Sequence, residues 1–190
     1  MGCTIIDETQ QSHLQSTDIP TIYLVSHNYS FIDILLTFDL VNKATNIPRI
    51  ISGVANIPNF VKLIITTLFN YVAPFIRFIP HNTCDGNTSI LLANELKNGN
   101  DIFIWQHAYN KHKSLYYIIS EVKPRLVYIN ISNTKIKSSI NTNFILYILY
   151  RTICSTYRVT SKVVDYSAYY IENSQNIYDD FNVKLWDDLQ

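Results

Sequence analysis

The sequence predicts an α/β fold, with a layered, mixed and mostly parallel sheet flanked by helices. Short runs of β-branched and aromatic residues alternate with longer segments of helical periodicity, which is the pattern of strands joined by helices. The chain has 190 residues, a length that fits one domain with a sizeable core. Hydrophobic residues make up 47% of it and charged residues 16%, so the composition excludes an intrinsically disordered chain.

Six short, apolar segments have the composition of strands. In chain order they are residues 22–25, 49–54, 75–79, 101–105, 126–131 and 157–166. Residues 1–19 are polar and are interpreted as an N-terminal lead-in, so a single α/β domain is expected over residues 20–190.

Five segments are expected to form helices. They are residues 31–41, 58–72, 88–96, 144–154 and 177–189. In the first, Leu36 and Leu40 fall on one face at helical spacing, and the third ends at Asn98-Gly99, a typical C-terminal signal. The longest apolar stretch, 63–76, has 14 residues, whereas a membrane-spanning helix needs about 20. We therefore expect no spanning helix, and the polar first residues indicate no cleavable signal peptide.

The charge balance and the cysteines exclude several kinds of protein. The 15 basic and 15 acidic residues give a net charge of zero, which excludes a basic nucleic-acid-binding domain. Cys3, Cys84 and Cys154 lie far apart without metal-ligand spacing, so neither a disulfide framework nor a zinc site is expected. The abundance of Ile and Asn is typical of an AT-rich genome and reduces the information that any single Asn carries.

The candidate site begins in the loop that follows the first predicted strand. Loops at the carboxyl ends of strands usually carry the chemistry of open α/β sheets. This loop offers His27, and Asp33 follows six residues later at the start of a predicted helix. An aspartate that fixes the imidazole tautomer would let His27 act as a general base. Three alternatives remain open: an ordinary surface histidine, an Asp33 that only stabilises a helix N-terminus, and a metal site with His81 and His107.

Residues 25–36, VSHNYSFIDILL, resemble the first block of the lysophospholipid/glycerol acyltransferase family. In that block a strand leads to Ser-Asn-His, four further residues, Asp and an apolar helix. Later segments resemble the family's subsequent blocks in the same order. They are PRII at 48–51, IPNF at 57–60, FIRFI at 75–79, LKNGNDIFIW at 96–105 and KPRLVYI at 123–129. The resemblance covers roughly residues 20–135 and implies an acyltransferase-like α/β fold.

The resemblance implies transfer of an acyl chain from acyl-CoA or an acyl carrier to the hydroxyl of a lysophospholipid or glycerol phosphate. His27 would be the general base and Asp33 its orienting partner. The residues implied for phosphate binding are His107, Lys111, Lys113 and, at the position of the arginine in the family's second block, either His81 or Arg77, which the alignment leaves undecided. No metal and no bound cofactor is implied, because acyl-CoA enters as a co-substrate. Such a protein is expected to be intracellular, attached peripherally to a membrane surface, and without a nucleic-acid partner.

The sequence departs from the family's pattern at the groups that carry the chemistry. The family's four-residue spacing, counted back from Asp33, falls on Asn28, so the Asn-His pair is reversed here. A carboxamide cannot accept a proton at neutral pH, which leaves His27 as the base only if the loop shifts by one residue. His107 stands where the family has an acidic residue, and Asn110 where it has an arginine. The alternative function is that of a catalytically inactive relative that binds a membrane, a lipid or a partner protein.

Overall fold

The computed structural model describes seven strands and three helices. It also describes a few isolated residues as helical. The described residues are 4–15, 17–26, 36, 39, 40, 43, 49–54, 63, 67, 76–81, 86–106, 113–133, 156–167 and 185. The strands are β1 (Thr4–Glu8), β2 (Thr21–Ser26), β3 (Arg49–Val54), β4 (Ile76–His81), β5 (Ile102–Gln106), β6 (Arg125–Asn133) and β7 (Thr156–Val164). The helices are α1 (Gln11–Leu14), α4 (Gly86–Lys97) and α5 (Lys113–Val122).

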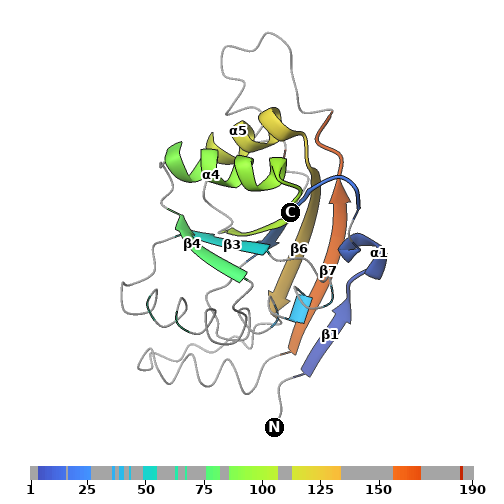
Figure 1. Cartoon of the computed structure of the whole chain (residues 1–190). Helices are drawn as coiled ribbons and strands as arrows, with labels where there is room; N and C mark the ends of the chain where they lie inside the picture. The colour runs from blue at the N-terminus through green and yellow to red at the C-terminus, as the bar shows by residue number, and fades with distance from the viewer. Residues whose placement is uncertain are drawn as a thin grey trace.

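One sheet contains all the described strands, in the order β1-β7-β6-β2-β5-β3-β4 (Figure 1). Every neighbouring pair from β6 across to β4 is parallel. β7 runs antiparallel to β6, and β1 at the sheet edge runs parallel to β7. The structure therefore confirms an α/β fold with a mixed, mostly parallel sheet.

β2 is the middle strand of the seven-stranded sheet and lies between β5 and β6. Its residues from Thr21 to Val25 are buried, and Tyr23 and Leu24 have no exposed surface. A parallel strand that is covered on both faces is expected to be continuously apolar, which explains why TIYLV shows no polar alternation. At the start of the strand, the backbone N–H of Thr21 donates to the buried carboxylate of Asp101 over 2.8 Å. This bond ties the beginning of β2 to the beginning of β5.

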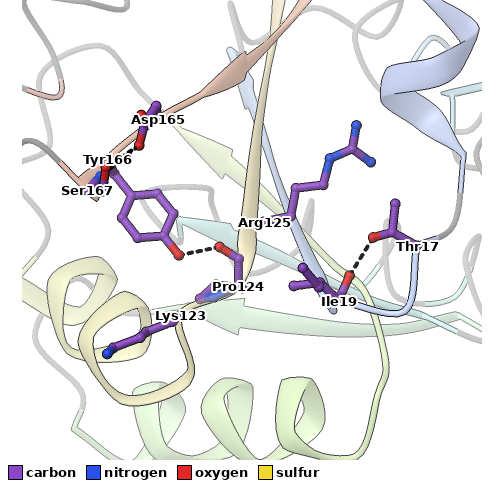
Figure 2. Close-up of a pocket in the computed structure, with 8 residues that line it drawn as sticks. All are labelled: Thr17, Ile19, Lys123, Pro124, Arg125, Asp165, Tyr166 and Ser167. Carbon is purple, nitrogen blue, oxygen red and sulfur yellow. Dashed lines mark hydrogen bonds between the residues drawn. The ribbon is translucent and has the colours of Figure 1, made fainter.

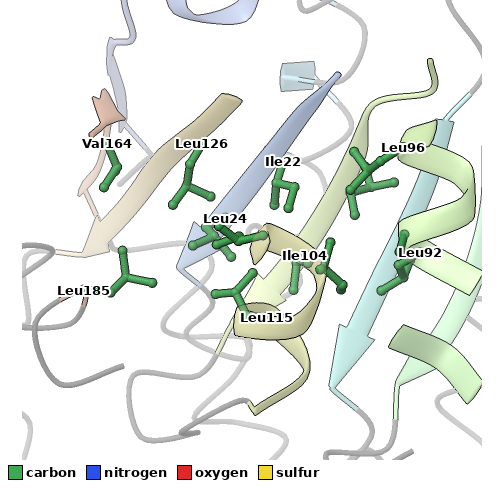
Figure 3. Close-up of a cluster of buried hydrophobic side chains, with 13 residues drawn as sticks. Ile22, Leu24, Leu92, Leu96, Ile104, Leu115, Leu126, Val164 and Leu185 are labelled. Atoms are coloured by element: carbon green, nitrogen blue, oxygen red, sulfur yellow. The ribbon is translucent and has the colours of Figure 1, made fainter. Parts of the chain in front are cut away.

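α4 and α5 cover one face of the sheet and pack against each other (Figure 1). The crossovers β4-α4-β5 and β5-α5-β6 advance in the same direction along the sheet, and right-handed connections then place both helices on one face. Alternate strand side chains meet the helices there in a buried cluster (Figure 3). Its members are Ile22, Leu24, Leu92, Ala93, Leu96, Ile102, Ile104, Leu115, Ile118, Ile119, Leu126, Val164 and Leu185.

The opposite face of the sheet buries the intervening strand positions. Tyr23 of β2 stacks on Phe103 of β5, with ring centroids 4.5 Å apart. The Tyr23 hydroxyl donates to the backbone carbonyl of Leu14 in α1 over 3.4 Å, and Leu14 itself is buried. α1 is therefore docked on this face by one buried leucine and by a hydrogen bond from the central strand.

An ion pair joins β1 to the helical segment that the structure describes at residues 36, 39, 40 and 43. Lys43 Nζ lies 2.8 Å from a carboxylate oxygen of Asp7 in β1 and 2.6 Å from one of Asp39. Leu36 and Leu40 are buried, as their helical spacing predicted. Partial burial acts to raise the pKa of Asp7, but hydrogen bonds, chiefly from Lys43, outweigh it and hold this pKa below its ordinary value of 3.8.

All six predicted strands are present, with ends within two residues of the predicted positions. The helix predicted for 88–96 is α4, and it is followed by Gly99 at a φ of +82°, which confirms the predicted stop. The helices predicted for 58–72, 144–154 and 177–189 lie outside the described residues, apart from helical positions at 63, 67 and 185. Within the described part of the chain, no helix combines the length and the apolar character needed to cross a membrane.

Two parts of the structure have no counterpart in the sequence prediction. β1 and α1 lie within residues 1–19, where composition indicated only a polar lead-in. α5 lies in a segment for which no element was predicted; in this helix Tyr116 packs against the core and Tyr117 is exposed. The physical reason is that Leu115, Ile118 and Ile119 are spaced to bury one helical face, which outweighs the β propensity of the tyrosines.

Leu24→Ala is expected to lower the free energy of unfolding by about 2–5 kcal/mol, because the side chain is fully buried in the central strand. Leu63→Ala is the matched control: Leu63 is 69% exposed, so the same truncation should cost less than about 0.5 kcal/mol. Urea denaturation followed by circular dichroism measures both losses. Equal losses in the two variants would contradict the position of β2 at the centre of the core.

Asp7→Asn is expected to lower stability at neutral pH by about 0–1 kcal/mol, since the ion pair with Lys43 is partly exposed and screened by solvent. Because the pKa of Asp7 is lowered by folding, its contribution is present above the pKa of an unfolded aspartate. It is lost as the pH falls through the lower, folded value. Thermal unfolding across a pH series measures this, with the exposed Asp18→Asn as control; a deficit of Asp7→Asn that persists in strong acid would refute the assignment.

Candidate functional site

Five parallel strands bring their carboxyl ends to one edge of the sheet, here called the carboxyl edge. Open α/β sheets bind their ligands in loops at this edge. The strand registers determine which residues meet there: Ser26 of β2 pairs with Gln106 of β5, and Val54 of β3 pairs with His81 of β4. β3 also pairs with β5, so the two pairs belong to one row of strand ends.

Three of the predicted histidines stand in the sequence at these strand ends or directly after them. His27 is the residue after Ser26, His107 is the residue after Gln106, and His81 is the last residue of β4. The positions of His27 and His107 thus directly follow two neighbouring strand ends, which are about 4.8 Å apart. His81 ends a strand three steps away from β2 in the sheet, at about 14 Å.

Arg77 and His81 were alternative candidates for one phosphate-binding position, and the structure separates them. Arg77 is the second residue of β4 and pairs with Ile50 near the start of β3. It precedes His81 by four residues, which is about 13 Å along a strand. His81 therefore stands at the carboxyl edge, whereas Arg77 stands near the amino end of the same strand.

The described part of the chain does not include four of the predicted site residues, namely His27, Asp33, His107 and Lys111. The contact between His27 and Asp33 therefore stays a prediction. Lys113 is the first residue of α5, which connects the carboxyl end of β5 to the start of β6. The N-terminal end of α5 is accordingly directed toward the carboxyl edge.

A polar cluster of described side chains stands at the end of β2. The Ser26 hydroxyl donates to Oδ1 of Asn130 over 3.1 Å and accepts the backbone N–H of Ile131 at 2.7 Å. A further side-chain hydrogen bond joins Ser26 to the hydroxyl of Tyr128. Tyr128 and Asn130 belong to β6, the other neighbour of β2, and all three side chains are half-buried. We call Ser26, Tyr128 and Asn130 the β2-end cluster.

Ser26 continues a hydrogen-bond ladder at the point where β2 leaves the sheet. β2 and β6 pair as far as Val25 and Ile129. At the next position, the Ser26 hydroxyl accepts the N–H of Ile131. In a continuing ladder, a main-chain carbonyl of β2 would accept this N–H. An apolar residue at position 26 would remove this side-chain acceptor from the end of the ladder. The hydrogen bonds of Ser26 with Asn130 and Ile131 therefore give a polar side chain at position 26 a role in the local structure.

The titration behaviour of Tyr128 keeps the β2-end cluster neutral. Burial raises the pKa of its phenol, and the hydrogen bond with Ser26 opposes this rise. The phenol accordingly stays protonated at neutral pH and can donate a hydrogen bond. The cluster can therefore orient and donate hydrogen bonds, but it supplies no charge.

Tyr128 and Asn130 were not among the sequence-predicted site residues. The richness of the chain in Asn made a single Asn uninformative, and Tyr128 was part of a predicted strand. A signal was nevertheless present in the alternation of β6, where Tyr128 and Asn130 continue the side of the strand that begins with the buried Leu126. Tyr128 and Asn130 are polar groups on the core side of β6, and they lie next to the end of β2. They indicate a site once the pairing of β2 and β6 is known.

The geometry of this edge can be set beside known proteins. No family model, no curated protein and no solved structure matches the chain. The likeness to the acyltransferase family therefore rests on the sequence blocks themselves. Among the described residues, no three His, Cys, Asp or Glu side chains gather as a metal site would require.

A pocket of about 530 Å³ lies at the opposite end of the sheet, where β2 and β6 begin (Figure 2). Its lining residues are Thr17, Ile19, Lys123, Pro124, Arg125, Asp165, Tyr166 and Ser167. The Arg125 guanidinium donates to the backbone carbonyls of Ser12 and Gln15, and the Tyr166 hydroxyl donates to the carbonyl of Pro124. These polar groups hold α1 and the turn before β6 together. None of the predicted site residues lines this pocket.

A second pocket, of about 400 Å³, lies between β1, β7 and the helical segment at residues 36–43. Its lining residues are Ile5, Asp7, Leu36, Asp39, Leu40, Lys43 and Val159. Four of them are aliphatic, and the other three form the ion pairs centred on Lys43. Val159 pairs with Ile131 near the carboxyl end of β6, so this aliphatic pocket lies toward the carboxyl edge.

Proposed function

We propose that the protein transfers an acyl chain from acyl-CoA or an acyl carrier to the hydroxyl of a lysophospholipid or glycerol phosphate, with an acyltransferase-like form of the α/β fold. The observation that carries the proposal is the pairing of Ser26 with Gln106. Two segments that resemble family blocks continue from these paired residues, one with His27 and the other with His107. Blocks that lie 80 residues apart in the sequence therefore start side by side at the carboxyl edge.

In the proposed reaction His27 is the general base and Asp33 orients it. The imidazole removes the proton of the acceptor hydroxyl, and the hydroxyl oxygen attacks the carbonyl carbon of the thioester. The tetrahedral intermediate collapses with cleavage of the C–S bond. The leaving thiolate takes the proton back from the imidazolium, so that the products are an ester and a free thiol. The thioester is already activated, and the reaction therefore needs no metal and no bound cofactor.

The proposed phosphate-binding groups are His107, Lys111, Lys113 and His81. Lys113 opens α5, and a helix N-terminus favours a neighbouring phosphate through its free N–H groups and its dipole. His81 stands about 14 Å from β2 across the sheet, so its role would be with a headgroup or a second phosphate rather than at the reacting hydroxyl. Arg77 is less suited to this role, because it stands near the amino end of β4.

The aliphatic pocket supports the acyl-chain part of the proposal. Leu36 and Leu40, which line it, belong to the segment that follows His27 and Asp33 in the first family-like block. A chain of methylene groups suits walls of Ile, Leu and Val, because its burial there gains about 0.8 kcal/mol per methylene. The volume of about 400 Å³ is within the range of small-molecule sites.

Attachment to a membrane surface is a further part of the proposal. Leu63 lies in the apolar segment predicted as a helix over 58–72, and the structure describes it as helical and 69% exposed. A large exposed leucine in an apolar helix suits insertion between lipid headgroups. This observation also favours the alternative function, an inactive relative that binds lipid, for which the displaced histidine at position 27 is the second argument.

Purified protein incubated with labelled acyl-CoA and a panel of lysophospholipids and glycerol 3-phosphate is expected to form an acylated product, measured by mass spectrometry. His27→Ala should reduce the rate about 100- to 10,000-fold, because general-base catalysis contributes a factor of this size. Absence of product with every acceptor would remove the enzyme proposal in favour of lipid binding. Full activity of His27→Ala would refute the assigned base.

The same assay tests the reversed Asn-His pair. The double variant His27→Asn/Asn28→His restores the family's order and should raise the rate above that of the wild-type protein if the one-residue shift limits catalysis. The single variant His27→Asn is the control and should be inactive. A double variant as inactive as the control would show that the loop is built for a base at position 27.

Liposome flotation is expected to recover the wild-type protein with vesicles that contain anionic phospholipid. Leu63→Glu should reduce the bound fraction, because a charge replaces an exposed leucine of the apolar segment. Ile90→Glu is the matched control, since Ile90 is also exposed but lies on α4. An equal effect of the two substitutions would contradict a membrane face at Leu63.

A further inference from the structure

The β2-end cluster fixes the orientation of the Asn130 carboxamide. The Ser26 oxygen already accepts the N–H of Ile131, and Tyr128 forms a second hydrogen bond with it. The single hydroxyl hydrogen of Ser26 is given to Oδ1 of Asn130. With Oδ1 fixed on Ser26, the two N–H groups on Nδ2 of Asn130 are directed away from Ser26.

The Nδ2 group of Asn130 has no acceptor recorded among the residues that the structure describes. Asn130 is half-buried, so its donors are partly shielded from water yet open to a ligand. Its partner Ser26 is the last residue of β2, and the proposed base His27 comes next in the chain. A pre-oriented, partly shielded donor therefore stands next to the point where the proposed chemistry begins.

We propose that Asn130 donates an Nδ2–H hydrogen bond to the thioester carbonyl oxygen as that oxygen becomes an oxyanion. This inference rests on the acyl transfer proposed above. When the acceptor oxygen attacks, the π electrons of the carbonyl move onto its oxygen, and the Asn130 donor stabilises the negative charge until the C–S bond breaks. Ser26 is a positioning residue, because it holds the carboxamide and does not touch the substrate.

Fixed donors of this kind are effective because they need no reorganisation when charge develops. Removal of one oxyanion donor typically lowers kcat about 100- to 1,000-fold. The loss appears in kcat rather than in KM, because the hydrogen bond strengthens as the carbonyl oxygen gains charge. A donor that bound a ground-state phosphate would instead act mainly on KM.

The decisive variant is Asn130→Asp, which keeps the shape of the side chain and its acceptance of the Ser26 hydroxyl proton but removes both N–H donors. In the acyl-transfer assay its kcat is expected to fall about 100-fold or more with little change in KM. The ratio of its kcat to that of the wild-type protein should rise as the pH falls toward the pKa of the introduced carboxyl group. The protonated carboxyl then offers an O–H donor in place of the amide, a recovery that a merely structural role would not produce.

Two further variants complete the test. Ser26→Ala leaves the carboxamide free to rotate, so it should lower kcat by less than Asn130→Asp and leave KM unchanged. Asn98→Asp adds the same charge beyond the end of α4, at the opposite edge of the sheet, and should leave kcat unchanged. Thermal unfolding confirms that each variant is folded; if Asn130→Asp does not fold, Asn130→Ala takes its place with the same expected loss of kcat.

The possible outcomes separate this inference from the proposed function. If the wild-type protein forms no product, both are overturned together. If it forms product and Asn130→Asp retains wild-type kcat, the acyl transfer stands and the role of Asn130 is overturned. A raised KM at unchanged kcat would likewise overturn the oxyanion role, since Asn130 would then bind substrate equally before and during the reaction.

Discussion

The parallel pairing of β2 with both β5 and β6 is the constraint on which the rest of the structure depends. It buries the apolar run TIYLV on all sides and aligns the start of the strand with Asp101 and its end with Gln106. Because the crossovers β4-α4-β5 and β5-α5-β6 advance in one direction along the sheet, right-handed connections place α4 and α5 on one face. The same registers gather the strand ends at the carboxyl edge, so the site is a consequence of how the core is packed.

The strands and α4 could be predicted because their signals are local. A β-branched run indicates a strand, and Asn98-Gly99 indicates the end of a helix whatever lies around them. β1 and α5 could not be predicted in this way. β1 is exposed along its whole length and depends on pairing with β7 and on the ion pair of Asp7 with Lys43, which join residues distant in sequence. α5 depends on the burial of one helical face beneath residues with β propensity.

The candidate site likewise contains residues that local sequence signals predict and residues that only strand pairing reveals. His27 and His81 were predicted from the order of sequence blocks, and strand register separates the positions of His81 and Arg77, between which the alignment alone did not decide. Tyr128 and Asn130 could not be found without the pairing of β2 and β6, because their meaning depends on Ser26, about 100 residues earlier in the chain. A residue whose role depends on contact with a neighbouring strand is not marked by a motif in its own stretch of sequence.

The polar side chains at the two ends of β2 have different hydrogen-bond partners, and this difference bears on the proposed function. At the amino end, Asp101 accepts a main-chain N–H from Thr21, so a buried carboxylate serves the fold itself. At the carboxyl end, Ser26 satisfies a main-chain N–H as well, but it also holds an Asn130 amide whose donors are directed elsewhere. A serine alone would meet the needs of the backbone, and an apolar residue at position 130 would avoid the cost of partly burying a carboxamide. An oriented amide at this end is therefore the feature on which the proposed oxyanion role of Asn130 rests.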